Sequence, residues 1–247
     1  DNNILSYNRY GLVLYGSDAM VSNNTIEWCN YGILATSWSN GTIENNYIAW
    51  SDTCGIRIDG WDNTVKRSSN PIVRNNTIMK TGRDVLNKGD AISIQYYSSP
   101  VIQDTNVVDW GEDGIYIGEQ CHPIIDKCVF DGQGGNYGVA TSSPGTVKIT
   151  NSTVVNTGNI SLATAFLIKT NCTFNQSKVI FQGTDSNLTV NWFLNTRVND
   201  DSGNRISNVN IRIRDNTNGI FDKNFTTDIN GFLNWTILKE YYQKDIN

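Results

Sequence analysis

Two aspartates, Asp90 and Asp113, occupy equivalent positions in successive copies of a repeated sequence. Each stands two residues before an isoleucine that recurs along the chain, and Glu112 precedes Asp113. If the copies stack, like charges at short range raise the pKa of one carboxyl group or recruit a cation. Asp90, Asp113 and Glu112 are therefore the candidate catalytic set, and calcium is the metal that Asp90 and Asp113 could share. The competing interpretation is that these aspartates are solvated side chains at corners of the fold.

Two insertions interrupt the repeat next to this set, at about residues 59–71 and 80–89. Insertions in repeat proteins emerge as loops on one face, which is often the binding face. They carry Trp61, Arg83 and Lys88, which predict a sugar-binding groove with an aromatic platform. The alternative is that the loops cap the side of the fold or touch a neighbour.

The spacing of the repeat predicts how these residues are positioned. Short β-branched runs, each with two or three apolar positions spaced by two, predict short strands with alternate side chains inward. A unit of about 22 residues punctuated by Gly and Asn predicts a solenoid. Three short strands per coil, with coils about 4.8 Å apart, give a parallel β-helix. The recurring apolar positions are Ile4, Ile26, Ile48, Ile78, Val107, Val129, Val154 and Phe174.

Asn or Asp recurs three residues before these apolar positions. Such residues tolerate the left-handed turn conformation, and stacked amides bond one another along a column. An apolar column lies two residues before the amides: Val21, Ile43, Val73, Ile102, Ile124 and Ile149. The predicted structural ladder consists of Asn23, Asn45, Asn75, Asn151 and Asn171.

Over roughly residues 1–190 this pattern resembles the right-handed parallel β-helix family that includes pectate lyases, polysaccharide epimerases and NosD-like surface proteins. The resemblance implies that a carboxylate set would act as acid and base, or would hold calcium beside an Arg or Lys base. Arg83 or Lys88 could supply that base only through the placement of their loop. The sequence around Asp90 lacks the double aspartate of polygalacturonases, and their Gly-His-Gly and Arg-Ile-Lys motifs are also absent.

From residue 187 the pattern changes to longer alternating runs separated by turns such as Asp-Asp-Ser-Gly-Asn at 200–204. The segment resembles the carboxypeptidase-regulatory-like or Ig-like β-sandwich modules of surface proteins. The expected fold is therefore all-β, with a right-handed parallel β-helix over 1–186 and a small antiparallel β-sandwich over 187–247. By comparison with these modules we expect one or two further strands, so either the fragment is truncated or a partner chain completes its sheet.

The composition favours an extracellular or cell-surface location. The chain carries 19 Lys and Arg against 24 Asp and Glu, a net charge of -5, which argues against nucleic acid as a partner. No apolar run is long enough to span a membrane in this piece. The chain lacks an initiating Met and begins inside a repeat, so we interpret it as a mature or trimmed fragment. The candidate glycosylation sites outside the ladder are Asn40, Asn159, Asn187, Asn224 and Asn234.

Five cysteines leave two interpretations open. Cys29 and Cys54 lie one coil apart near the same corner, which allows a disulfide. Buried free thiols in the stacked coils are the simpler alternative.

Three functional hypotheses follow. The first is a structural or adhesive cell-surface protein, such as a self-assembling subunit of an envelope layer or filament, with itself or neighbouring surface proteins as partners. The missing catalytic motifs favour this non-enzymatic role. The second is a polysaccharide-active enzyme, a lyase, epimerase or glycosidase, that works from Asp90, Asp113 and Glu112. The third is carbohydrate binding without turnover through the Trp61 loop.

Overall fold

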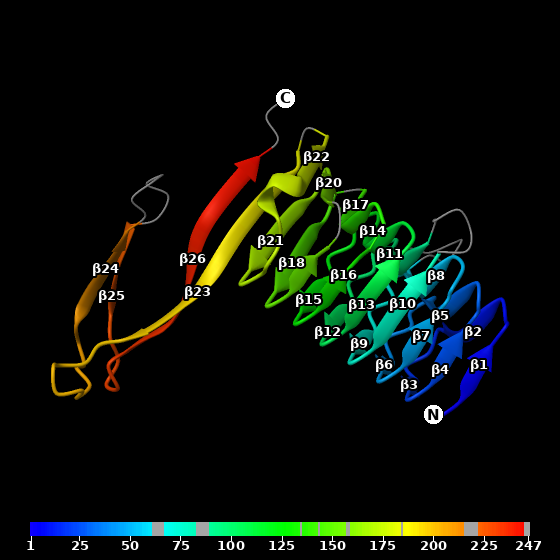
Figure 1. The fold of residues 1–247 in the computed structure, drawn as a ribbon, viewed down its shortest axis with the longest axis horizontal. Helices are drawn as coiled ribbons and strands as arrows, with labels where there is room; N and C mark the ends of the chain where they lie inside the picture. The colour runs from blue at the N-terminus through cyan, green and yellow to red at the C-terminus, as the bar shows by residue number, and fades with distance from the viewer. Residues whose placement is uncertain are drawn as a thin grey trace.

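A computed structural model describes residues 1–60, 67–82, 89–133, 135–142, 144–156, 159–183, 185–214 and 222–244. The chain winds through three parallel sheets in turn, so that each strand from β1 to β18 pairs with the strand three places further along. The coils stack into a solenoid, and a long hairpin extends from its C-terminal end (Figure 1). The parallel solenoid predicted from the repeat is confirmed. Among the described residues, no helix is long and apolar enough to cross a membrane.

The three sheets run side by side along the solenoid, and sheet A ends one coil before sheets B and C. Sheet A consists of β1 (Ile4–Ser6), β4 (Thr25–Glu27), β7 (Tyr47–Ala49), β10 (Thr77–Thr81), β13 (Asn106–Trp110), β16 (Val129–Asp131) and β19 (Thr153–Val155). Sheet B consists of β2 (Tyr10–Tyr15), β5 (Tyr31–Thr36), β8 (Cys54–Asp59), β11 (Asp90–Gln95), β14 (Asp113–Ile117), β17 (Tyr137–Thr141), β20 (Asn159–Ala163) and β22 (Val179–Gln182). Sheet C consists of β3 (Met20–Ser22), β6 (Thr42–Glu44), β9 (Ile72–Arg74), β12 (Val101–Gln103), β15 (Ile124–Asp126), β18 (Thr146–Thr150), β21 (Phe166–Thr170), β23 (Asn187–Arg197) and β26 (Phe232–Lys244).

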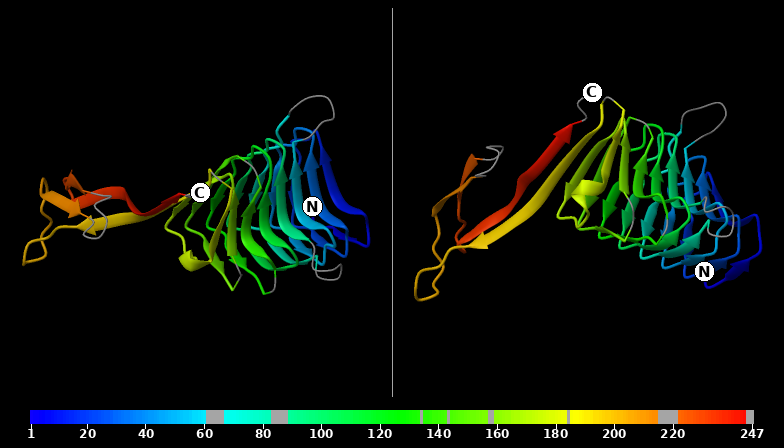
Figure 2. Two further views of the ribbon diagram at one scale, coloured as in Figure 1. Left: turned by 90° about the horizontal axis from the view of Figure 1, so that it is seen from above. Right: turned by 45° about the horizontal axis from the view of Figure 1, so that its top comes forward.

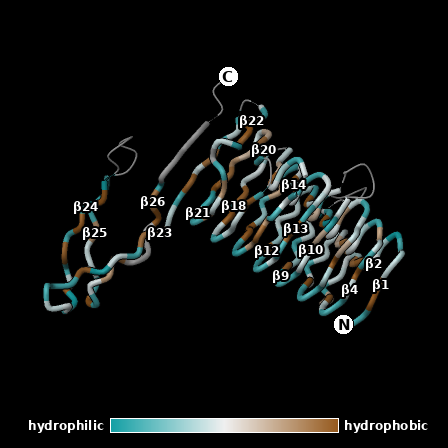
Figure 3. Tube along the Cα trace, in the orientation of Figure 1, coloured by the Kyte–Doolittle hydropathy of each residue, from teal (hydrophilic) through white to brown (hydrophobic). Residues whose placement is uncertain are grey.

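The register of the sheets places like residues on top of one another. In sheet A, Ile26 pairs with Ile48 and Ile48 pairs with Ile78, and all three side chains are fully buried. Hydrophobic residues recur in successive coils along the tube (Figure 3). Strand alternation therefore gives one continuous apolar core inside the solenoid, and the other side of each strand remains available for function.

The buried amide ladder lies one residue beyond the predicted column. Nδ2 of Asn24 donates to Oδ1 of Asn46 at 3.0 Å, and Nδ2 of Asn46 donates to Oδ1 of Asn76 at 3.1 Å. These three side chains are at most 2% exposed. The bonds satisfy amides that would otherwise be costly to bury.

The predicted ladder residues instead form the exposed turn next to it. Asn23, Asn45, Asn75, Asn151 and Asn171 all have positive φ angles of 50 to 57°. Of these, Asn171 donates to Oδ1 of Asn151 at 2.7 Å on the surface. The ladder prediction was therefore wrong for Asn23, Asn45 and Asn75, because each turn needs one left-handed residue and the following residue turns inward.

One coil also departs from the predicted register. Phe130, not Val129, pairs with Val107 and is fully buried, whereas Val129 is 40% exposed. In the same coil Ile125 is buried and Ile124 is 45% exposed. The turn residue here is Lys127, with a φ of 52°, so the predicted apolar columns are displaced by one residue.

The five cysteines are all buried and carry free thiols. The Cys29–Cys54 disulfide is therefore not formed, and the free-thiol alternative describes the structure. Burial raises the pKa of Cys121 and of Cys128 to about 12. Thiols held in this protonated state contribute to the core as small apolar groups.

The strand pairs β23–β26 and β24–β25 of the C-terminal part are antiparallel, as predicted, whereas the packing of two sheets into a β-sandwich stays a prediction. A 3-10 turn, η1 (Gln176–Lys178), precedes β22. Residues Asn187–Asn191 of β23 continue sheet C by pairing with β21. From Asn187 to Arg197 the strand also pairs antiparallel with β26, and this two-stranded ribbon extends beyond the solenoid (Figure 1). A separate two-stranded sheet, β24 (Asn210–Arg214) with β25 (Asp222–Thr226), lies at the far end (Figures 1 and 2). The boundary at 187 and the Ig-like or carboxypeptidase-regulatory-like identity stay predictions.

Candidate functional site on sheet B

The repeat register brings the predicted carboxylates together. Ile92 of β11 pairs with Ile115 of β14, which sets Asp90 beside Asp113 at the start of adjacent strands. The column continues to Cys54 on one side and to Tyr137 on the other. The backbone N–H of Asp113 bonds to the carboxyl group of Asp90, and the N–H of Tyr137 bonds to that of Asp113.

Burial raises the pKa of both aspartates. The pKa of Asp90 rises to about 7, first because its carboxyl group is buried and then because of the charge of Glu112. The pKa of Asp113 rises to about 8, first through burial and then through the charges of Asp90 and Glu112. Oδ1 of Asp113 is buried and has no hydrogen-bond partner among the described residues. All three predicted carboxylates therefore interact, and the buried pair holds a proton near neutral pH.

The arrangement favours a proton donor over a pair of ionised groups. Asp113 is only 5% exposed, whereas Asp90 is half-buried and Glu112 is exposed. Acid–base catalysis by two carboxylates needs environments that move their pKa values apart, and here burial moves both upward. In the described ranges, no group of three or more His, Cys, Asp or Glu side chains is arranged to hold a metal ion. Calcium binding at Asp90 and Asp113 stays a prediction.

A polar and aromatic patch covers the outer side of β2, β5 and β8. The rings of Tyr10 and Tyr31 stack with centroids 5.4 Å apart, and Cζ of Arg57 lies 6.0 Å from the centroid of Tyr31. Arg57 forms an ion pair with Asp59 at 3.1 Å and bonds Oε1 of Gln95 at 3.4 Å. These residues, except Gln95, line an open cavity of about 280 Å³ together with Leu34 and Thr36.

A second cavity continues the same side toward the C-terminal coils. It has a volume of about 300 Å³, and its lining includes Gln95, Tyr116, Glu119 and Ser142. The hydroxyl groups of Tyr116 and Ser142 are 2.6 Å apart and hydrogen-bonded. Gln95 lines this cavity and also bonds Arg57 in the first. We call the two cavities and the residues that line them the sheet B strip.

Sequence reasoning did not find the sheet B strip. The available signal was the outward position between two inward isoleucines, which Arg57 occupies in β8 and Tyr116 occupies in β14. The predicted ligand-binding residues Trp61, Arg83 and Lys88 lie outside the described residues.

The predicted glycosylation sites differ in exposure. Asn40 is exposed, but its Oδ1 accepts a bond from the N–H of Asn70 at 3.0 Å. Asn224 is exposed on β25, whereas Asn159 and Asn187 are half-buried. The side chain of Asn234 lies outside the described part of the chain. Glycosylation of these sites stays a prediction.

Comparison with known proteins finds one resemblance, which covers the N-terminal coils. Residues 1–87 match the family model described as a right handed beta helix region, and this part of the chain is therefore similar to that family. No curated protein and no solved structure matches the chain.

Proposed function

We propose that this is an adhesive extracellular surface protein that binds an extended polysaccharide along the sheet B strip. The observation that carries the proposal is the continuity of the strip, in which Gln95 joins the cavity of Tyr31 and Arg57 to the cavity of Tyr116. Protein sites for hydroxyl-rich ligands combine aromatic surface with a few convergent polar groups. Stacked parallel strands repeat such groups along one line, which suits a linear polymer.

The charges on the strip favour a neutral polysaccharide. Asp59 offsets the charge of Arg57 through their ion pair, and Glu112 and Glu119 add exposed carboxylates nearby. A polyanion would meet like charges at this surface, and such repulsion weakens binding. The net charge of -5 acts in the same direction.

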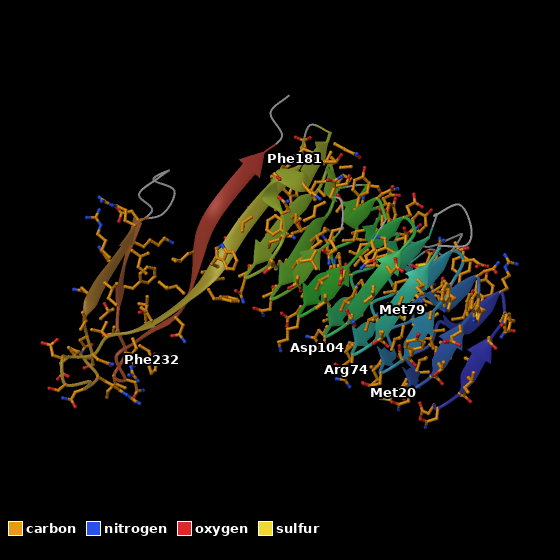
Figure 4. All side chains as sticks on the ribbon, viewed as in Figure 1. Met20, Arg74, Met79, Asp104, Phe181 and Phe232 are labelled. Atoms are coloured by element: carbon orange, nitrogen blue, oxygen red, sulfur yellow. The ribbon has the colours of Figure 1, made fainter. Side chains whose placement is uncertain are left out.

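The test compares two arginines that differ mainly in the sheet that carries them. Arg57 on sheet B and Arg74 on sheet C each pair with an acidic side chain on the outer side of a strand. Arg74 lies along the lower edge of the solenoid with Met20 and Asp104 (Figure 4). Affinity for a panel of neutral polysaccharides would be measured by calorimetry for Arg57→Gln and Arg74→Gln. The charge-assisted bonds of Arg57 predict a loss of about tenfold or more.

Arg74→Gln should leave affinity within about twofold, because rim charges outside an interface contribute little. Equal losses in both variants, or an absence of binding to the whole panel, would refute the proposal.

A second candidate function is polysaccharide cleavage, and one observation favours it. The half-buried carboxyl group of Asp90, with its pKa near 7, is suited to donate a proton at neutral pH. Asp90→Asn keeps the size of the side chain and removes its acid. Turnover that disappears in this variant while the circular dichroism stays unchanged would support catalysis. Full activity in the variant, or no enzyme-dependent product from uronate and neutral polysaccharides, rejects it.

A further inference from the structure

A lysine replaces an apolar residue inside the solenoid. Lys169 of β21 pairs with Ile149 on one side and with Val190 on the other. Both neighbours are at most 1% exposed, and Lys169 itself is fully buried. Its Nζ has no hydrogen-bond partner among the described residues. Buried lysines are rare unless they are paired, so this position calls for a chemical explanation.

The surroundings of Lys169 disfavour the charged form of its amine. Nζ lies 3.8 Å from the centroid of the Phe174 ring. Burial lowers the pKa of Lys169 to about 7, and the Cys172 thiol is the titratable group that acts on it. A neutral amine is a nucleophile, and removal of lysine from water is one way in which proteins activate it. At neutral pH the neutral fraction of such an amine exceeds that of a reference lysine by roughly a thousandfold.

Phe174, whose ring covers this amine, also lines a large cavity. The cavity has a volume of about 720 Å³, and its lining combines Phe174 and Ile160 with the polar side chains of Asn156, Asn175 and Ser177. Phe174 is only partly buried against the core. A phenyl ring that lines the cavity and also covers Nζ can control access from the cavity to the amine of Lys169.

The backbone beside Phe174 has little strand pairing among the described residues. Where earlier coils have a strand of sheet A, this coil has a single bridge between Thr153 and Thr173. Segments with few backbone bonds open locally at low cost. A rotation of the Phe174 side chain therefore exposes Lys169 without disturbing β21, which is paired on both sides.

We infer that Lys169 and this cavity form a covalent binding site for a small hydroxylated aldehyde, such as the open-chain form of a reducing sugar. The amine adds to the carbonyl carbon, and the carbonyl oxygen leaves as water with the two amine hydrogens. The product is an imine between the ligand and Nζ. A neutral imine relieves the cost of a buried charge, and the Asn and Ser side chains bind the ligand hydroxyl groups. This site is separate from the sheet B strip.

The test traps the imine on the intact chain. The protein is incubated with glycolaldehyde and cyanoborohydride, which reduces an imine to a stable secondary amine, and the modified lysines are located by peptide mass spectrometry. We expect modification of Lys169 to be at least about tenfold faster than that of the exposed Lys148. Phe174→Ala should accelerate modification of Lys169 further, because this substitution removes the phenyl ring that covers Nζ. Lys178→Arg, at the rim of the cavity, should leave the Lys169 adduct unchanged.

Two results overturn the inference. One is modification of Lys148 and Lys178 with none at Lys169 in both the wild type and Phe174→Ala. The other is a Lys169 adduct that forms no faster than that of Lys148. Lys169→Met restores an apolar side chain to the column and serves as the control for the adduct. In this variant the peptide that contains position 169 must be unmodified. Its circular dichroism shows that the coil still folds.

Discussion

Replacement of Lys169 by methionine should stabilise the protein, although it deletes a polar group. Methionine is nearly as long as lysine, is flexible enough to fill the space of the lysine side chain, and carries no charge. Its neighbours in the column, Ile149 and Val190, are apolar and buried. The variant therefore removes the cost of burying an amine and leaves the packing of β21 in place.

The size of the effect follows from the pKa of Lys169. A fall from 10.5 to about 7 means that the protonated amine costs the folded state roughly 5 kcal/mol. The contact with Phe174 returns about 1 to 2 kcal/mol of this in the wild type. We therefore expect Lys169→Met to raise the free energy of unfolding by about 3 kcal/mol at pH 6.

The pH dependence has a definite sign. Below pH 7 the amine is protonated in both the folded and unfolded states, so the full cost is present. Between pH 7 and 10.5 the unfolded state binds more protons, and wild-type stability rises with pH. The advantage of the methionine variant should therefore shrink to about 1 kcal/mol at pH 9.5.

Chemical denaturation of both proteins at pH 6 and pH 9.5 measures this difference, and hydrogen exchange in β21 reports the same local effect. This expectation is refuted if the two proteins have equal unfolding free energies at pH 6, or if the advantage of the methionine variant grows with pH. Either result would show that burial does not disfavour the protonated amine of Lys169.

Three further predictions concern other parts of the solenoid. Asn46→Ala leaves its ladder neighbours unpaired and should cost about 3 kcal/mol or more in thermal denaturation, whereas Asn45→Ala, in the exposed turn, should cost about 1 kcal/mol; a larger loss at Asn45 would contradict the ladder assignment. Asp113→Asn should stabilise the protein by at least about 1 kcal/mol at pH 8 and less at pH 5, because burial raises the folded pKa to about 8 and the charged form becomes costly as pH rises; denaturation at the two pH values checks the sign. Gly32→Ala places a Cβ 2.5 Å from the carbonyl oxygen of Gly55 and should lower the unfolding free energy by about 2 kcal/mol, which an unchanged melting temperature would rule out.

The fold was predictable because stacking repeats one physical requirement in every coil. Strand alternation and turn residues recur at a near-constant spacing, and this spacing predicts the parallel sheets. The one-residue errors have a local cause. At Val129-Phe130 and at Ile124-Ile125 both neighbours are apolar, so composition does not say which one points inward.

The same ambiguity affected the ladder. Asn23 and Asn24 are identical in type, but their backbone conformations give them different roles. The first has a positive φ and lies in the exposed turn, and the second is buried and bonds the next coil. A sequence pattern counts both equally.

The candidate site residues could be predicted only where the stacking register of the coils is enough to bring two side chains together. Asp90 and Asp113 adjoin because their coils stack in register, and the column showed this. The patch around Arg57 depends on which outward side chains meet across strands, which spacing does not encode. Lys169 could have been found, since it stands two residues before Asn171, as Val21 stands before Asn23. A lone lysine in a strand is ordinarily assigned to the solvent side.

The direction of the amide ladder bears on how the chain folds as it is synthesised. The N–H and Nδ2 groups of Asn24 both donate to Oδ1 of Asn46, and those of Asn46 donate to Oδ1 of Asn76, so these amide-to-amide bonds run from an earlier coil to a later one. Nδ2 of Asn46 and Nδ2 of Asn76 also donate back to the carbonyl oxygens of Val21 and Ile43 in the preceding coils. During translation, the backbone N–H of Asn24 or Asn46 and one hydrogen of its Nδ2 group therefore stay unpaired until the next coil emerges. Only the newest coil keeps unpaired amide donors, because each later coil supplies the acceptor for the coil before it. The ladder thus makes vectorial growth from the N-terminus the natural order of assembly.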